Sequence, residues 1–215
     1  MKILAYSNDN FWSNLDKHIS SREEEVSSKI EADVKLIIKE IKNYGDDKVI
    51  QFAKDFDNIN LKKDEIKINN LKKLYSFEKL SSETVKSFRL AIQNIRIFHE
   101  KQYPSDYEIT NMNAKLGSIW KPMDSVGLYI PGGNAVYPSS LIMSVVPAQI
   151  AGVKRIVCVT PPSNKFDPYI AFLLDELNIY EVYQIGGAQA IAALTYGTQT
   201  IKPVSKIFGP GNAYV

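Results

Sequence analysis

The sequence predicts an α/β protein, with a doubly wound parallel sheet preceded by a mainly helical N-terminal region. Three observations favour this class. Apolar runs alternate with helical segments through short connections after residue 120. Apolar residues recur at helical spacing before residue 110. The composition also changes between the two regions, because nine of the ten prolines and nine of the eleven glycines follow residue 120.

The first expected helix carries a single apolar stripe. Ser20 and Ser21 stand at capping-box spacing before Glu23 and Glu24, so we expect the helix to begin there. Gly45 is placed to end it in a left-handed C-cap. The stripe consists of Val26, Ile30, Val34, Ile37, Ile38, Ile41 and Tyr44.

Further elements complete the N-terminal region. They are a helix over 46–56, a strand over 65–69, a helix over 85–98 capped by Ser81 or Ser82, and a hairpin over 107–120. The change in composition places a boundary near this hairpin. We therefore divide the chain into a helical region, 1–118, and a sheet-forming domain, 119–215.

The second region alternates strand and helix. Its expected strands are 126–130, 155–160, 181–185 and 206–208, and its helices are 140–151, 168–177 and 186–194. The run 155–160 is apolar throughout, which is typical of a parallel strand buried on both faces. In such sheets, ligands bind beyond the carboxyl ends of the strands, where the strand order switches.

Three glycine-containing loops follow expected strands: Pro131-Gly-Gly133, Gly186-Gly187 and Gly209-Pro-Gly211. Glycine lets the backbone approach a ligand closely, and the following helix offers free N–H groups to a dinucleotide pyrophosphate. Each loop alone is better explained as an ordinary strand-to-helix turn, and none has the G-x-G-x-x-G pattern. Three such loops on successive strands favour a shared ligand.

Tyr129, Gln189 and Asn212 stand in or beside these loops. A tyrosine at a strand end can stack on a base or bond a ribose, and the amides can donate to ribose hydroxyls and accept from them. Capping and turn formation are the structural alternative, above all for Asn212, which is a natural helix N-cap.

The remaining composition points to no acid, base or metal set. His18 and His99 lack acidic residues at metal-motif spacing, and we expect the one cysteine, Cys158, to be a buried, inert thiol. The net charge of +2 with mixed signs argues against a nucleic-acid surface. No apolar stretch is long enough for a membrane span or a signal peptide, so a cytoplasmic protein is expected.

The loops also carry a resemblance. The stretches 126–140, 143–152, 159–162, 185–194 and 206–214 resemble the histidinol dehydrogenases in order and spacing, and 37–57 and 94–99 fit more loosely. The resemblance covers nearly the whole chain. It implies a Rossmann-like fold for the second region, with the N-terminal region forming part of an incomplete second α/β domain.

What the resemblance implies is an oxidoreductase. The family oxidises L-histidinol to L-histidine with two NAD in histidine biosynthesis, uses zinc to anchor the substrate, and forms homodimers. Carried over, its NAD contacts are Tyr129, Gln189 and Asn212. Its zinc ligands and its catalytic acid and base are expected beyond Val215, so this chain is expected to supply the cofactor platform and to lack activity alone.

Two alternatives remain open at this point. The chain can belong to a dehydrogenase of the same family that acts on another small alcohol, such as a sulfonated diol. It can also be a stand-alone dinucleotide-binding module, although the apolar stripes on its N-terminal helices argue against a complete module.

Overall fold

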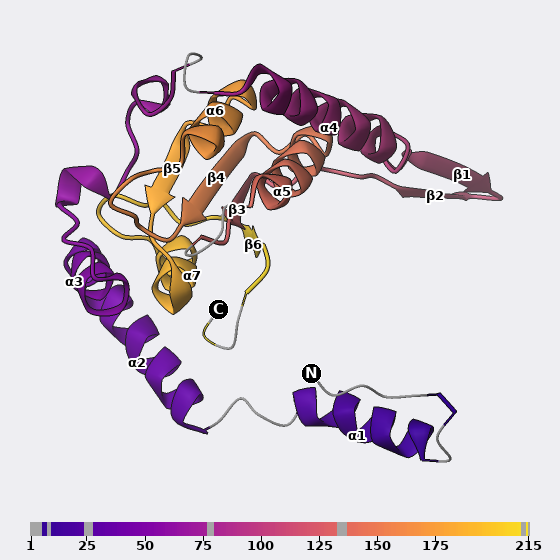
Figure 1. The fold of residues 1–215 in the computed structure, drawn as a ribbon. Coiled ribbons are helices and arrows are strands. Elements are labelled where there is room, and N and C mark those ends of the chain that lie inside the picture. Colours follow the sequence, from indigo (N-terminus) through magenta and orange to yellow (C-terminus); the bar gives the residue numbers. More distant parts are fainter. Residues whose placement is uncertain are drawn as a thin grey trace.

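The computed structural model describes residues 6–7, 10–23, 28–76, 80–132, 137–211 and 214 (Figure 1). Its helices are α1 Phe11–Glu23, α2 Ser28–Tyr44, α3 Asp46–Asp57, α4 Ser82–Glu100, α5 Pro138–Ile150, α6 Pro168–Glu176 and α7 Gly187–Tyr196. Its strands are β1 Tyr107–Asn111, β2 Ala114–Ser118, β3 Ser125–Tyr129, β4 Arg155–Thr160, β5 Glu181–Gln184 and β6 Lys206–Phe208. Single 3-10 turns occupy Lys63–Glu65 and Leu71–Lys73.

The main sheet has four parallel strands in the order β5-β4-β3-β6, which confirms the predicted doubly wound class. Leu128 of β3 lies opposite Cys158 of β4 on one side and Phe208 of β6 on the other. The chain winds outward from β3 to β5 and then crosses back to β6. The switch in strand order therefore falls between β3 and β6, and ligands of such sheets bind near the carboxyl ends of these strands.

Both faces of the sheet are buried. Cys158 faces the core that contains α5 and α6, whereas its neighbours Val157 and Val159 face the core that contains α7. This alternation explains why the 155–160 run is apolar at every position. The predicted strand is therefore confirmed, as are the other three strands of the sheet.

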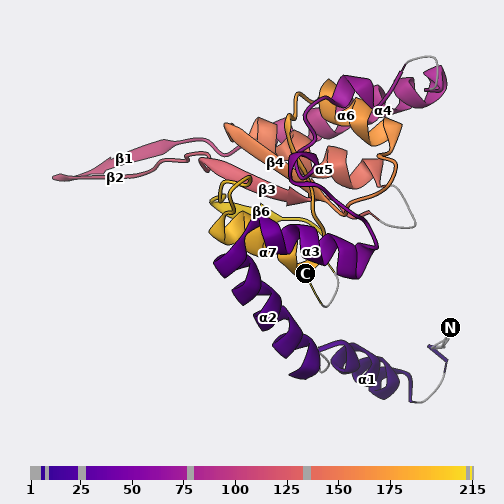
Figure 2. The same cartoon turned by 90° about the vertical axis from the view of Figure 1, so that its left-hand side faces the viewer.

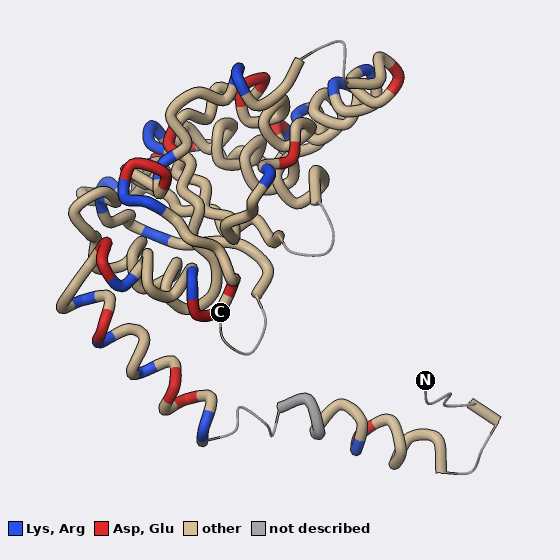
Figure 3. Tube along the Cα trace, turned by 60° about the vertical axis from the view of Figure 1, so that its left-hand side comes forward, with Lys and Arg blue, Asp and Glu red and all other residues tan. Residues whose placement is uncertain are grey.

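The N-terminal helices extend these two layers. Figures 1 and 2 show α4 beside α5 and α6 on one side of the sheet, and α2 and α3 beside α7 on the other. Val85 of α4 is buried in the first core, while Ile41 of α2 is buried in the second. Basic and acidic residues alternate along α2 (Figure 3). The division of the chain at residue 118 stays a prediction.

Most predicted elements of the first region are confirmed. Helix α3 matches the expected 46–56 segment, and α4 begins after Ser81, whose hydroxyl accepts from the Thr84 amide at 3.4 Å. Strands β1 and β2 form the expected hairpin, with Ile109 opposite Leu116. Within the described ranges, no helix is both long and apolar enough to cross a membrane.

Three local expectations are wrong. The predicted helix start at Ser20–Ser21 lies inside α1. At the N-terminal end of α1, the rings of Tyr6, Phe11 and Trp12 make edge-to-face contacts. The next helix, α2, begins instead at Ser28. Ser20 and Ser21 therefore lie in the last turn of α1 and not at a helix start.

Gly45 ends α2 with a positive φ of 56°, but its ψ of −125° is not that of a left-handed cap. The reason is that Gly45 also begins α3, where its carbonyl accepts from the Lys48 and Val49 amides. The expected strand over 65–69 is reduced to a single antiparallel bridge between Lys67 and Tyr183, because 3-10 turns flank it closely on both sides.

Arg155 fixes the loop that returns the chain to β6. Its guanidinium bonds both carboxylate oxygens of Glu181 in β5, at 2.9–3.1 Å, and donates to the carbonyls of Lys202 and Pro203. Bidentate geometry of this kind is among the stronger charge-assisted contacts. The Arg155 contacts therefore hold the crossover loop against β4 and β5.

Asp46 connects the N-terminal helices to the sheet domain. Its side chain is fully buried and accepts from the Thr200 amide at 3.2 Å and the Thr200 hydroxyl at 2.6 Å. Its own amide donates to Gln199 Oε1 at 2.7 Å, and Lys63 Nζ lies 3.7 Å from its carboxylate. A buried carboxylate is tolerated here because these donors compensate its lost hydration.

Replacing Asp46 by alanine leaves the Thr200 amide and hydroxyl in the interior without their acceptor. We expect Asp46→Ala to lower the free energy of unfolding by about 2–4 kcal/mol, measured by urea denaturation. Asp47→Ala is the matched control, because Asp47 is exposed on the same first turn of α3. Equal losses in the two variants would show that the helix dipole, and not the Thr200 contacts, explains the effect.

Cys158 is buried, as expected, and burial raises the pKa of its thiol to about 12. We expect a thiol reagent at pH 8 to label it only after unfolding by urea. Because the unfolded thiol ionises near pH 9, the folded state loses stability relative to Cys158→Ala as the pH rises from about 9 to 12. Rapid labelling of the native chain would contradict this account.

Candidate functional site

The glycine loops converge at the carboxyl edge of the sheet. A Cβ added to Gly132 would lie 3.1 Å from Pro161 Cδ, and one added to Gly186 would lie 2.8 Å from Pro161 Cγ. A Cβ on Gly209 would come within 2.4 Å of the Tyr129 carbonyl oxygen. Gly132 and Gly186 thus pack against the Pro161 ring, and Gly209 packs against the Tyr129 backbone, so larger residues at these positions would push the loops apart.

A cleft of about 920 Å³ opens beside these loops. Its floor comes from the ends of β3 and β4 and the start of α7, and its opposite wall comes from α2 and α3. The wall carries four apolar and four charged side chains, and the floor contains Gly132 and Gly187. The main residues of the cleft are Leu36, Ile37, Phe52, Phe56, Asp57, Tyr129, Gly132, Pro161, Gly187 and Gln189.

Tyr129 ends β3 and is the first of the predicted site residues. Only 8% of it is exposed, and its hydroxyl oxygen accepts from the Gly187 amide at 3.1 Å. Burial raises its pKa, with a smaller contribution from the charge of Asp57 and an opposing one from the Gly187 bond. The hydroxyl therefore stays protonated at neutral pH, and it can donate its own hydrogen bond in addition to accepting from Gly187.

Gly187 and Gln189 form the first turn of α7. Gly187 has a φ of +59°, and a Cβ there would lie 2.7 Å from Gln189 Oε1. Gln189 is 4% exposed and folds back beneath the loop. The Gly187 amide donates to Tyr129, but the preceding residue, Gly186, has no side chain to cap the helix, so the later amides of this turn and the positive end of the dipole remain available to the cleft.

The structure brings two of the three predicted residues together. Tyr129 and Gln189 both line the cleft and are joined through Gly187. Asn212 lies outside the described residues. Its loop begins at Gly209, which packs against Tyr129, and Tyr214 lines the same cleft.

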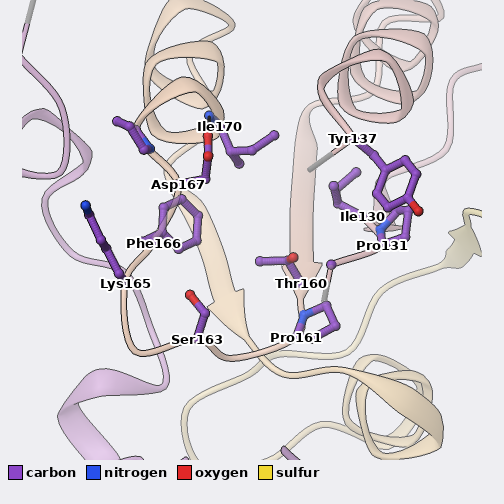
Figure 4. Close-up of a pocket in the computed structure, with 12 residues that line it drawn as sticks. Ile130, Pro131, Tyr137, Thr160, Pro161, Ser163, Lys165, Phe166, Asp167 and Ile170 are labelled. Carbon is purple, nitrogen blue, oxygen red and sulfur yellow. Dashed lines mark hydrogen bonds between the residues drawn. The ribbon is translucent and has the colours of Figure 1, made fainter. Parts of the chain in front are cut away.

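A smaller hollow of about 290 Å³ lies on the other side of Gly132 and Pro161. Figure 4 shows Tyr137 and Lys165 on opposite sides of it. The helix that points at this hollow, α6, already has a cap: Asp167 Oδ1 accepts from the amides of residues 169 and 170 at 2.8 and 3.0 Å. Asp167 thus occupies the first amides of α6, whereas Gly186, the N-cap of α7, has no side chain to compete for the amides that follow Gly187, so the start of α7 is the better place for a pyrophosphate.

Sequence reasoning missed the wall of the cleft. Phe52 and Phe56 stack with ring centroids 5.2 Å apart and planes 8° from parallel, and Phe56 remains 56% exposed. Their spacing of four residues on one helix face was the available signal. Asp57 was missed as well. Its Oδ2 is buried and has no hydrogen-bond partner among the described residues, and burial raises the pKa of the carboxyl.

No group of three His, Cys, Asp or Glu side chains that could hold a metal ion occurs among the residues with described positions. His18 lies on α1 and His99 in the last turn of α4, where its ring meets Phe98 edge to face. Neither histidine lines the cleft.

Comparisons with known proteins agree on one family. The family model described as histidinol dehydrogenase matches residues 20–215. Histidinol dehydrogenase of Brucella abortus (strain 2308) is 41% identical over 197 residues, covering 91% of this chain and 46% of the relative. That of Carboxydothermus hydrogenoformans is 40% identical over 203 residues, covering 94% of this chain and 47% of the relative.

A solved structure gives the same result. Crystalline histidinol dehydrogenase from Elizabethkingia anophelis superposes with a TM-score of 0.82 at 33% identity, covering 88% of this chain and 44% of that one. The chain thus spans about half the length of the relatives that it matches. The glycine loops, the switch-point cleft and these matches together show that the chain belongs to the histidinol dehydrogenase family.

Proposed function

We propose that this chain is the NAD-binding part of a histidinol dehydrogenase, which oxidises L-histidinol to L-histidine in two NAD-dependent steps. The observation that carries the proposal is the cleft at the switch point, where Tyr129 meets the uncapped start of α7. The relatives named above are all histidinol dehydrogenases, which supports histidinol over another small alcohol as the substrate.

The residues of the cleft suit a dinucleotide. The Gly187 amide donates to Tyr129, and the N-cap Gly186 has no side chain that competes for the next amides of α7, which are therefore the donors offered to a pyrophosphate. The Tyr129 hydroxyl can donate to a phosphate or ribose oxygen, and the Gln189 amide at the helix start supports the same turn. The exposed ring of Phe56 offers a flat face for a base. NAD would supply the hydride acceptor, and these side chains would hold it.

The described part of the chain offers no group of three His, Cys, Asp or Glu side chains for the family's zinc. Asn212 is proposed as a third NAD contact from its motif alone. We also propose that the complete enzyme acts as a homodimer, as the family does.

The direct test is to titrate the chain with NAD by calorimetry and to assay NADH formation with histidinol and zinc. We expect saturable NAD binding with a rate at least about a thousandfold below that of a full-length relative, because acid, base and metal each contribute on that scale. Failure to bind NAD would contradict the proposal that this chain holds the cofactor. Turnover near the rate of the relative would contradict the proposal that this chain lacks the catalytic groups.

Tyr129→Phe tests the polar contact at the end of β3. Loss of the hydroxyl removes one donor to the ligand and the acceptor of the Gly187 amide. We expect NAD to bind about five- to thirtyfold more weakly, the equivalent of about 1–2 kcal/mol.

Tyr183→Phe is the matched control. Tyr183 is also a buried tyrosine of this sheet, but its hydroxyl donates to the Thr200 carbonyl away from the cleft. Equal effects of the two substitutions on NAD affinity would count against a role for Tyr129 in the site.

A further inference from the structure

Asp57 occupies a position that is unfavourable for a carboxylate. It is the last residue of α3, where the negative end of the helix dipole disfavours a negative charge. Its Oδ2 is shielded from solvent and has no partner among the described residues. A buried, unpaired carboxylate oxygen lowers the stability of the free protein, and here no contact within the described chain compensates it.

The same carboxylate lies in the cofactor cleft. Asp57 and Tyr129 both line it, and the charge of Asp57 is felt at the Tyr129 hydroxyl. Phe56, its neighbour in sequence, turns an exposed ring to the same cleft beside Leu36 and Ile37. An adenine ring on the apolar part of this wall, beside Phe56, would bring its ribose to the end of α3, with the pyrophosphate directed toward α7.

The charges of the cleft favour the ribose diol of NAD over the 2′-phosphate of NADP beside Asp57. Three carboxylates, those of Asp33, Glu40 and Asp57, line it beside Lys48. The Lys48 ammonium is 2.7 Å from Glu40 Oε2, so its charge is already engaged. A carboxylate accepts from two vicinal hydroxyls, whereas a 2′-phosphate would meet charges of its own sign.

We propose that Asp57 accepts the hydroxyls of the adenosine ribose and thereby selects NAD over NADP, an inference that rests on the cofactor cleft proposed above. Asp57 is thus a specificity residue supplied by the N-terminal helices. The unpaired carboxylate lowers the stability of the ligand-free chain, and the same carboxylate provides the acceptor for the ribose.

The test uses the 215-residue chain with Asp57→Asn, titrated with NAD and with NADP. Asp55→Asn is the matched control, since it removes an exposed carboxylate from the same turn of α3. We expect Asp57→Asn to bind NAD about tenfold more weakly and to lose most of the preference of NAD over NADP, whereas Asp55→Asn binds like the parent chain.

Thermal unfolding without ligand gives a readout that a merely structural role would not produce. We expect Asp57→Asn to raise the melting temperature by about 2–4 °C relative to Asp55→Asn, because it removes the charge of a partly buried carboxylate whose Oδ2 is shielded and unpaired among the described residues. A lower melting temperature with unchanged NAD affinity would make Asp57 structural.

The remaining outcomes also decide the question. Equal weakening of NAD and NADP would place Asp57 away from the adenosine ribose and overturn the selection. If the parent chain binds NAD and Asp57→Asn binds it equally well, the Asp57 proposal fails while the cofactor cleft stands. If the parent chain binds neither dinucleotide, both fail.

Discussion

Val157, Cys158 and Val159 follow one another in β4 and are all buried, two against the α7 side and one against the α5 and α6 side. A strand with no polar face can only be satisfied by helices on both sides of the sheet. That requirement makes the connections cross over, keeps the strands parallel and brings all their carboxyl ends to one edge. The position of the cleft follows from it, because each glycine loop leaves a strand at that edge.

The N-terminal helices meet the same requirement from outside the βα alternation. Helix α4 lies on α5, and α2 lies on α7, so both layers are widened by chain that precedes the first strand of the sheet. The buried Asp46 fastens this packing to the Thr200 loop. The opposite wall of the cleft therefore exists only because α2 and α3 are held beside α7.

The groups that line the cleft differ in whether the ligand-free protein already satisfies their hydrogen bonds. The glycine backbone and the start of α7 are arranged by the fold itself, and Tyr129 and Gly187 satisfy one another. Asp57 differs, because its Oδ2 is left without a partner among the described residues at the unfavourable end of a helix. Unsatisfied groups of this kind in a native protein call for an explanation, and a bound ribose provides one.

The sequence predicted what local patterns determine. The strands, the parallel sheet and the three glycine loops depend on apolar periodicity and turn residues, which are legible within short windows, and the structure reproduces them. Tyr129 and Gln189 could be placed at the site because they follow or begin such elements. That Asp57 and Tyr129 line the same cleft could not be predicted, since they are 72 positions apart and are brought together by packing of α3 against the sheet edge.

Local patterns also failed where several elements compete for one segment. The serine pair at 20–21 resembled a helix start although α1 runs through it, and the alternation over 65–69 produced only one bridge because turns confine it. In both cases the outcome depends on neighbours that a short window does not contain.

The most direct measurement is a crystal structure of the chain grown with NAD. The account predicts the dinucleotide in the cleft between α3 and α7, with its pyrophosphate at Gly187 and its adenosine ribose on Asp57. A dinucleotide in the smaller hollow between Tyr137 and Lys165, or one whose phosphates lie away from α7, would contradict it.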